Sequence, residues 1–473
     1  MTAAPSSRDI VAELWRRAGG DVSALDDLKL SGAEPALPSS FRVGAAAQAS
    51  IAAAALAAAE LRYRAGAARQ AVSVDMRHAA IEFRSEHYLT IGGKAPATMF
   101  DPLFAAYATG DDRFVRLHMN FSHHRENVLK FLDCAPTRAS IEAALRQWEA
   151  VAFEAEAYQR GCVVAAMRSP EEWAAHPQAA AVASMPPVLI EKIGDAPPRP
   201  LPRGARPLSG LRVLDLTRII AGPVAGRALA AHGADVMRIS APGLPFIEWL
   251  VKDTGRGKLS AYADLASPEG KETLARLVEG ADIVLQAFRP GALDARGFGI
   301  ADMAATRPGV VYGSLSAYGA AGPWAGRRGF DSLVQTATGF NHMEAQAAGT
   351  EGPKELPCQA LDHASGYLLA FGTLMARIRQ ASEGGSWRVR VSLAATGRWL
   401  WNLGRIENGF SARIPSRADV EDLLEESPSP FGPMRAVRHA AQLSDTPAAW
   451  TRPSVPLGTH PAVWPSIPKV VRA

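Results

Sequence analysis

The amino-acid sequence predicts an α/β protein in which a parallel sheet is covered by helices on both faces. Short apolar segments alternate with helical segments between residues 212 and 316, which is typical of parallel strands joined by crossover helices. The chain has 473 residues, 48% of them hydrophobic, so it is long enough for two or three domains with separate cores. A proline-rich stretch around residues 196–207 marks a stiff linker between these domains.

The net charge and the cysteine content limit the classes of function that the sequence supports. The net charge is +4, but Lys and Arg are spread along the chain. This mild excess suits an anionic small molecule, and no nucleic-acid motif accompanies it, so no nucleic-acid partner is expected. The cysteines are far apart and odd in number, which argues against a disulfide framework or a metal cluster and favours a reducing cytoplasm: Cys134, Cys162 and Cys358.

The elements before the linker are read from periodicity. Residues 1–85 form a helical segment, with an amphipathic helix at 9–17, a loop at 21–31, a helix at 45–64, a strand at 71–76 and a further helix from 77. The Ala-rich run before Arg62 is interrupted by Gln48 and Glu60, so it is interpreted as a buried helix rather than a membrane span.

Residues 86–195 are predicted to form a smaller α+β domain. Its elements are a strand at 112–117, helices at 125–132 and 140–150, a buried strand at 161–167 and a helix that begins at Ser169. Three histidines lie in its first half, without the spacing of a metal site, and are expected in a solvated loop: His118, His123 and His124. No metal is therefore predicted.

After the linker, strands and helices alternate. Strands are expected at 212–216, 235–239, 260–263, 283–286 and 310–316, and helices at 222–232, 268–279 and 300–306. Ligands of such sheets bind beyond the carboxyl ends of the strands. The first such turn, from Asp215 to Pro223, is neither a GxGxxG fingerprint nor a Walker loop, so neither a dinucleotide nor ATP is indicated.

The stretch 359–379 places one carboxylate, Asp362, at the start of an apolar helix. An acid there can simply cap the helix. A second observation favours a functional interpretation: superposing residues 45–64 on 360–379 pairs Arg62 with Arg377, and the strand and helix that follow recur as well. The repeat places Ala47 opposite Asp362, so only one copy carries the acid. The alternative is that Ala-rich helices resemble one another by composition.

Several blocks of the chain resemble the class III CoA-transferases, the family of formyl-CoA and carnitine CoA-transferases. They are VLDLTRIIAGP, GADV, GRGK, SPEG, FRPG, YGAAGP and GFD, within about residues 211–393. Residues 72–190 look like the family's smaller domain, and 428–460 are similar to its closing segment, with Gly-Thr-His where the family usually has Gly-Glu-His. The order is unusual, because here the smaller domain precedes the large one.

The resemblance implies a Rossmann-like large domain at residues 208–410, a C-terminal tail at 411–473 that resembles the closing segment, and an interlocked homodimer. It also implies transfer of CoA from an acyl-CoA to a small carboxylic acid, with no permanently bound cofactor. Asp362 would be the nucleophile, forming an anhydride and then a thioester. The residues implied in CoA binding are Thr217, Ala221, Gly222, Pro223, Arg238, Lys258, Phe288 and Arg289.

The chain also departs from the family pattern. Gln286-Ala287-Phe288 stands where Glu-Asn-Phe is usual, Ser240 replaces an acid, and Leu259 follows the RGK motif. These changes leave open a degenerate member that binds CoA esters without turnover. A third possibility is an acyl-CoA racemase or epimerase of the same fold, which uses a His and Asp pair; here Phe330 occupies the usual His position, and a phenyl ring cannot carry a proton.

Overall fold

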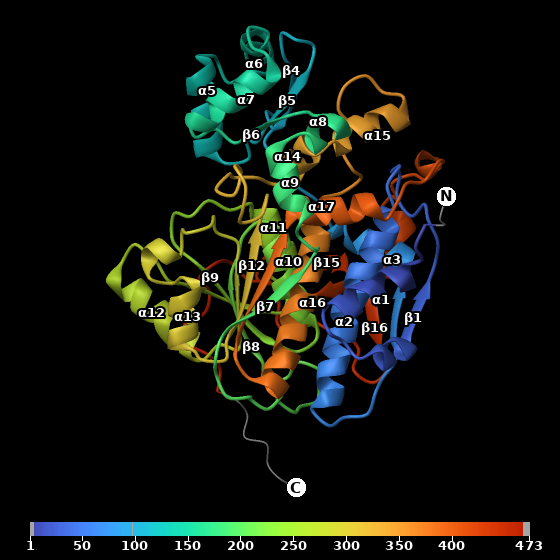
Figure 1. Ribbon diagram of the computed structural model, residues 1–473, viewed down its shortest axis with the longest axis vertical. Helices are drawn as coiled ribbons and strands as arrows, with labels where there is room; N and C mark the ends of the chain where they lie inside the picture. The colour runs from blue at the N-terminus through green and yellow to red at the C-terminus, as the bar shows by residue number, and fades with distance from the viewer. Residues whose placement is uncertain (1–3, 97, 467–473) are drawn as a thin grey trace.

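The structure is a computed structural model that describes residues 4–96 and 98–466 (Figure 1). Its centre is a seven-stranded sheet in the order β10-β9-β8-β11-β12-β13-β7. All neighbours are parallel except β7, which pairs antiparallel with β13. The strands are β7 Leu189–Gly194, β8 Arg212–Leu216, β9 Asp235–Ser240, β10 Lys258–Tyr262, β11 Ile283–Gln286, β12 Val311–Ser316 and β13 Ser386–Ser392.

Counted from β8, the six parallel strands lie in the spatial order 3-2-1-4-5-6, which is the Rossmann order. The order reverses between β8 and β11, so the turns that follow these two strands open a crevice at the carboxyl edge of the sheet. The predicted α/β fold and the strands after the linker are confirmed, with boundaries shifted by one or two residues.

Helices cover both faces of the sheet. Successive residues of each strand face opposite sides, and both sets are apolar, so both faces must be shielded from water. Val213 packs in the core with α10 and α16, whereas its neighbour Leu214 packs in a second core with α12 and α13. The helices of this part are α10 Ala221–Ala231, α11 Glu248–Thr254, α12 Pro268–Glu279, α13 Ile300–Thr306, α14 Asp331–Ala337, α15 Phe340–Ala348, α16 Ala360–Glu383 and α17 Leu393–Asn402.

The smaller α+β domain has its own core and lies at one end of the large domain, at the top of Figure 1. Its antiparallel sheet consists of β4 Ala105–Ala108, β5 Phe114–Leu117 and β6 Val164–Ala166, covered by α5 Ser122–Leu132, α6 Arg138–Leu145 and α7 Ala150–Gln159. The single helix predicted at 140–150 is wrong: it ends at Leu145, and the Trp148 ring packs between Phe131 and Phe153 before α7 begins.

The N-terminal segment belongs to the core of the large domain. It contains α1 Ser7–Arg17, β1 Leu28–Ser31, α2 Val43–Arg64, β2 Val72–Asp75, α3 Met76–Glu82, α4 Ser85–Tyr88 and β3 Thr90–Ile91. The loop expected at 21–31 is wrong, because a 3-10 turn and β1 occupy it. Helix α2 is long and apolar enough to cross a membrane, but it is buried from Val43 to Leu61 and lies along α16, as expected of a buried helix (Figure 1).

The predicted repeat has the same strand environment in both copies. In the first, β2 follows α2 and pairs parallel with β1 and antiparallel with β16 Ala441–Leu443. In the second, β13 follows α16 and pairs parallel with β12 and antiparallel with β7. Strand β7 follows the first copy in sequence yet completes the sheet of the second, whereas β16 follows the second copy and completes the first. The two copies therefore exchange their last strands within one chain.

The remaining elements join these parts. Helices α8 Pro170–Ala174 and α9 Pro177–Ala183 lead from the smaller domain to β7, and the predicted start at Ser169 is confirmed by a capping box with Glu172. In the C-terminal tail, β14 Leu424–Ser427 pairs with β15 Met434–Val437, which pairs in turn with β3. The tail thus closes back onto the N-terminal segment.

Candidate active site

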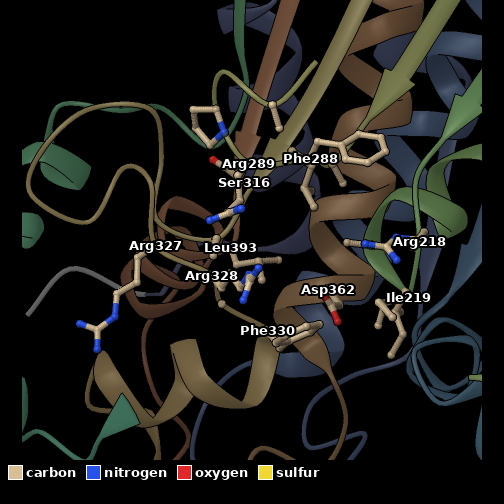
Figure 2. A pocket seen from close by; sticks show the side chains of 18 of the residues that line it. Arg218, Ile219, Phe288, Arg289, Ser316, Arg327, Arg328, Phe330, Asp362 and Leu393 are labelled. Carbon is tan, nitrogen blue, oxygen red and sulfur yellow. The ribbon is translucent and has the colours of Figure 1, made fainter. Parts of the chain in front are cut away.

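A cavity of about 420 Å³ opens at the carboxyl edge of the central sheet, beside the point where the strand order reverses. The turns after β8 and β11, the end of β12, the loop before α14 and the smaller domain all line it. Figure 2 shows Asp362 and Phe330 toward one end and Arg289 and Ser316 toward the other. The site is therefore shared between the large and smaller domains.

Asp362 lies in this cavity as the third residue of α16, with 7% of its surface exposed. Its carboxylate makes no hydrogen bond to any residue that the structure describes. The helix is capped instead by Asp331, whose Oδ2 accepts hydrogen bonds from the backbone N–H groups of Leu361 at 2.7 Å and Asp362 at 2.9 Å. The capping interpretation of Asp362 is therefore wrong, and its side chain is left for other chemistry.

Burial raises the pKa of Asp362 well above its usual value, and the carboxylates of Asp331 and Glu86 raise it further. The positive end of a helix dipole favours the ionised form of a carboxylate at its N-terminus. That effect is weakened, because Asp331 already occupies the N–H groups of the first turn. Asp362 is consequently a basic carboxylate in a partly apolar cavity.

A second helix, α10, directs its N-terminus at the same cavity, and no side chain among the described residues caps it. The backbone before it is strained: Ile219 has φ of 74°, a left-handed conformation that is costly for a β-branched residue. Gly366 on α16 lets the two helices meet, since a Cβ there would collide with the carbonyl oxygen of Ala221. The uncapped N–H groups of α10 can therefore stabilise negative charge that develops in the cavity.

Arginine side chains line the cavity, and they come from the turn after β8, the segment after β11 and the loop before α14. They are Arg218, Arg289, Arg296, Arg327 and Arg328. Ile219, Phe288, Phe330 and Leu393 supply apolar surface among them (Figure 2). Guanidinium groups bind phosphates through paired hydrogen bonds. The cavity thus suits a ligand with several phosphates and an apolar or reactive end near Asp362.

The residues proposed from the sequence divide into two groups. Asp362, Ala221, Phe288 and Arg289 line the cavity. The others lie behind it and are buried: Thr217, Gly222, Pro223, Arg238 and Lys258. Most of the arginines and aromatic residues of the cavity were not singled out from the sequence, since each lies on a loop whose partners are distant along the chain.

Lys258 is engaged in a buried ion pair. Its Nζ lies 2.8 Å from Asp215 Oδ2 and donates a 2.8 Å hydrogen bond to the carbonyl oxygen of Pro223. Burial lowers the pKa of Lys258 to about 8, although the Asp215 carboxylate opposes the shift. Thr217 Oγ1 also donates to Asp215 Oδ1. These contacts fix the turn before α10, so in this structure Lys258 supports the cavity wall from behind.

We expect Lys258→Met to lower the free energy of unfolding by about 3–5 kcal/mol, because it leaves the Asp215 carboxylate buried without its partner. Urea unfolding measures this loss, and Asp215→Asn added to Lys258→Met should restore part of it. The KM for an acyl-CoA in the folded protein should change little. Wild-type stability combined with a strongly raised KM would instead support the CoA-binding role that the family resemblance implies for Lys258.

The histidine prediction is partly wrong. His118 and His124 are each 3% exposed, and their Nδ1 atoms lie 3.0 Å apart. The His118 ring stacks on Phe330 with centroids 3.7 Å apart. Burial lowers the pKa of both rings to about 3; His124 lowers that of His118 further, and His123 lowers that of His124 further. Both are therefore neutral near pH 7, and His123 and His124 line the cavity that contains Asp362.

Comparison with known proteins identifies the part of the chain that forms the cavity floor. Residues 208–429 match the profile of CoA-transferase family III. This region belongs to CoA-transferase family III. It contains the central sheet apart from β7, the turns after β8 and β11, and the helix that carries Asp362. The expected family is thereby confirmed.

Relatives of this family III region are named for related activities. The probable fatty acyl-CoA transferase Rv3272 of Mycobacterium tuberculosis is 36% identical over 207 residues, 41% of this chain and 52% of that protein. The succinate–glutarate CoA-transferase of Agrobacterium fabrum is 35% identical over 167 residues, 32% of this chain and 42% of that protein. The chain thus spans about half the length of these relatives or less.

A crystal structure of Rv3272 from M. tuberculosis matches with a TM-score of 0.39 and 36% identity, over 41% of this chain and 56% of that one. The matched parts again represent only a portion of each chain. The smaller domain, which supplies His123 and His124, lies outside the family III region.

Proposed function

We propose that this protein transfers CoA between an acyl-CoA and a carboxylic acid, with Asp362 as the nucleophile. The observation that carries the proposal is a buried carboxylate without a hydrogen-bond partner among the described residues, in a cavity lined by arginines. A structural carboxylate would be paired or hydrogen-bonded, since burial of such a group is otherwise costly. The family III match and the names of its relatives support the same reaction class.

The proposed reaction is a series of acyl transfers, each of which forms one bond and breaks one bond without water. The ionised Asp362 oxygen attacks the thioester carbonyl carbon, the C–S bond breaks, and the CoA thiolate leaves with the electron pair. The thiolate then attacks the aspartyl carbonyl of the mixed anhydride, which releases the first acid and leaves an aspartyl-CoA thioester. The second carboxylate reverses these two steps and departs as the new acyl-CoA.

The residues around Asp362 would contribute to different steps of this reaction. The uncapped N–H groups of α10 would stabilise the oxyanion of each tetrahedral intermediate. Arg218, Arg289, Arg296 and Arg328 would hold the phosphates of CoA. The neutral His118 and His124 cannot protonate the CoA thiolate at pH 7, so it stays available to attack the anhydride.

Mass spectrometry after incubation with a panel of acyl-CoAs tests this proposal. The expected result is a CoA adduct on a peptide from residues 359–379, which hydroxylamine converts to a hydroxamate. No label is expected within residues 40–64, because Ala47 is fully buried and has no nucleophilic atom. Label in that helix would overturn the proposal, and acyl-CoA binding without any adduct would support the degenerate binder.

A second candidate, an acyl-CoA racemase or epimerase, is favoured by one observation. Asp362 and His124 line the same cavity, and a carboxylate and a neutral imidazole can together remove and return an α-proton. Phe330 does not exclude it, because this imidazole comes from the smaller domain. Deuterium uptake at the α-carbon of an acyl-CoA in D2O, lost in Asp362→Asn and in His124→Gln, would favour this activity over CoA transfer.

The homodimer and the cytoplasmic location remain proposals. The family resemblance and the reduced state of Cys134, Cys162 and Cys358 support them. Within the single chain, however, Asp362 and the smaller domain already form one cavity. Sedimentation at micromolar concentration tests the dimer, and a monomer with full activity would contradict it.

A further inference from the structure

Asp331 is the group that connects the loop before α14 to the start of the Asp362 helix. It is 2% exposed and is the first residue of α14, 29 positions before the first residue of α16 in the sequence. Its Oδ2 accepts hydrogen bonds from the backbone N–H groups of Leu361 and Asp362, and its Oδ1 accepts one from Gln335 Nε2. Gln335 is held in turn by the backbone N–H of Leu356.

These contacts fix the first turn of α16 from outside the helix. Gln359, at the N-cap position, makes no side-chain capping bond, so Asp331 replaces the local cap. Because the bonded N–H of Asp362 is one bond from its Cα, the position of the Asp362 carboxylate follows that of Asp331. The preceding residue, Phe330, lines the same cavity and stacks on His118.

A cap alone does not require a negative charge here. Asn caps helices about as well as Asp, and it would avoid burying one carboxylate beside another. The other titratable and charged groups that face Asp331 and Asp362 come from several elements: Glu86 on α4, Arg84 before it, Cys358 before α16, His363 on α16, and Arg218, Arg328 and His124 across the cavity. Within this set, Asp331 contacts the Asp362 backbone directly.

We propose that Asp331 is a positioning residue that holds Asp362 at the cavity through the backbone of α16 and places a negative charge beside its carboxylate. This inference rests on the proposed function. A more basic carboxylate is a stronger nucleophile once ionised. Since attack needs the ionised form, acyl-enzyme formation should rise with pH through the raised pKa of Asp362. Removing the negative charge of Asp331 should lower the pKa of Asp362, so the increase in the rate of acyl-enzyme formation should occur at lower pH.

Two variants separate the charge from the cap. Asp331→Asn keeps an acceptor for the Leu361 and Asp362 N–H groups, so it should fold and shift the pH profile of acyl-enzyme formation down by about one unit. Asp331→Ala also loses the cap, and its plateau rate should fall about 10- to 100-fold through misplacement of the nucleophile. Asp302→Asn, at the exposed start of α13, is the matched control and should leave the profile unchanged.

An infrared titration gives a readout without substrate. The carboxylic acid band of Asp362 is obtained as the difference between the spectra with and without Asp362→Asn. This band should titrate at lower pH in the Asp331→Asn background than in wild type. Unchanged titration and an unchanged rate profile in Asp331→Asn, with only reduced stability in Asp331→Ala, would overturn the proposal and leave Asp331 a structural cap. Absence of an acyl-enzyme in wild type would instead refute the proposed function, while the infrared shift would still decide the role of Asp331.

Discussion

Asp362→Ala is expected to abolish CoA transfer and to leave the protein folded. A methyl group cannot attack a thioester, so no acyl-enzyme can form. The stability should be equal to that of wild type or higher, because the variant removes a buried carboxylate that lies close to Asp331 and makes no hydrogen bond to a described residue. Transfer assays with trapped adducts measure the first effect, and thermal unfolding measures the second.

Asp302→Ala provides the control for this variant, since it removes a carboxylate from the exposed first turn of α13. It should lower stability by about 1 kcal/mol, because the backbone N–H of Gly299 loses its hydrogen bond to Asp302 Oδ2, and it should leave the transfer rate unchanged. Retention of transfer by Asp362→Ala would contradict the assignment of the nucleophile. Unfolding of Asp362→Ala would mean that the carboxylate is structural after all.

The double variant Arg289→Ala with Arg328→Ala is expected to raise the KM for an acyl-CoA about 100-fold. Each guanidinium that bonds a phosphate contributes about 1.5–3 kcal/mol, and 1.4 kcal/mol corresponds to a tenfold change in affinity. Both side chains line the cavity, and Arg289 lies toward the end away from Asp362 and Phe330 (Figure 2). Steady-state kinetics at low and high salt measure the change, which should shrink as salt screens the charges.

A substrate without phosphates makes this test specific. An acyl-pantetheine thioester keeps the reacting bond, so wild type and the double variant should use it with similar KM values. Arg276→Ala on the outer face of α12, where the side chain is 57% exposed and pairs with Glu272, is the matched control. A fall in kcat with unchanged KM for the acyl-CoA would show that Arg289 and Arg328 act on the reaction instead of on the phosphates.

Much of the fold could be predicted because it depends on local patterns. Strands β8, β9, β11 and β12 are short apolar segments between helices, and such segments form a parallel sheet wherever both faces are covered. The repeat was visible because α2 and α16 share spacing and small residues. Asp362 could be singled out since it opens the second copy at the position where the first copy has Ala47.

The cavity could not be predicted in the same way, because its residues converge from distant loops. Arg218, Arg328 and His124 meet only after the sheet order places β8 beside β11 and the smaller domain covers their edge. The exchange of β7 and β16 between the two copies is likewise a tertiary event, since strand pairing depends on which edge is free and not on the sequence of the strand alone.

The sequence by itself determined the sheet, the family and the acid that distinguishes the two helix copies, because these follow from periodicity and from contiguous motifs. Only the tertiary structure decided which charges face solvent, a ligand or one another. Lys258 follows a glycine-rich motif, yet its ammonium group is buried against Asp215. Asp331 lies 31 residues before Asp362 in the chain but contacts its backbone. Such distances are set by packing, and packing also decides the protonation of each carboxylate.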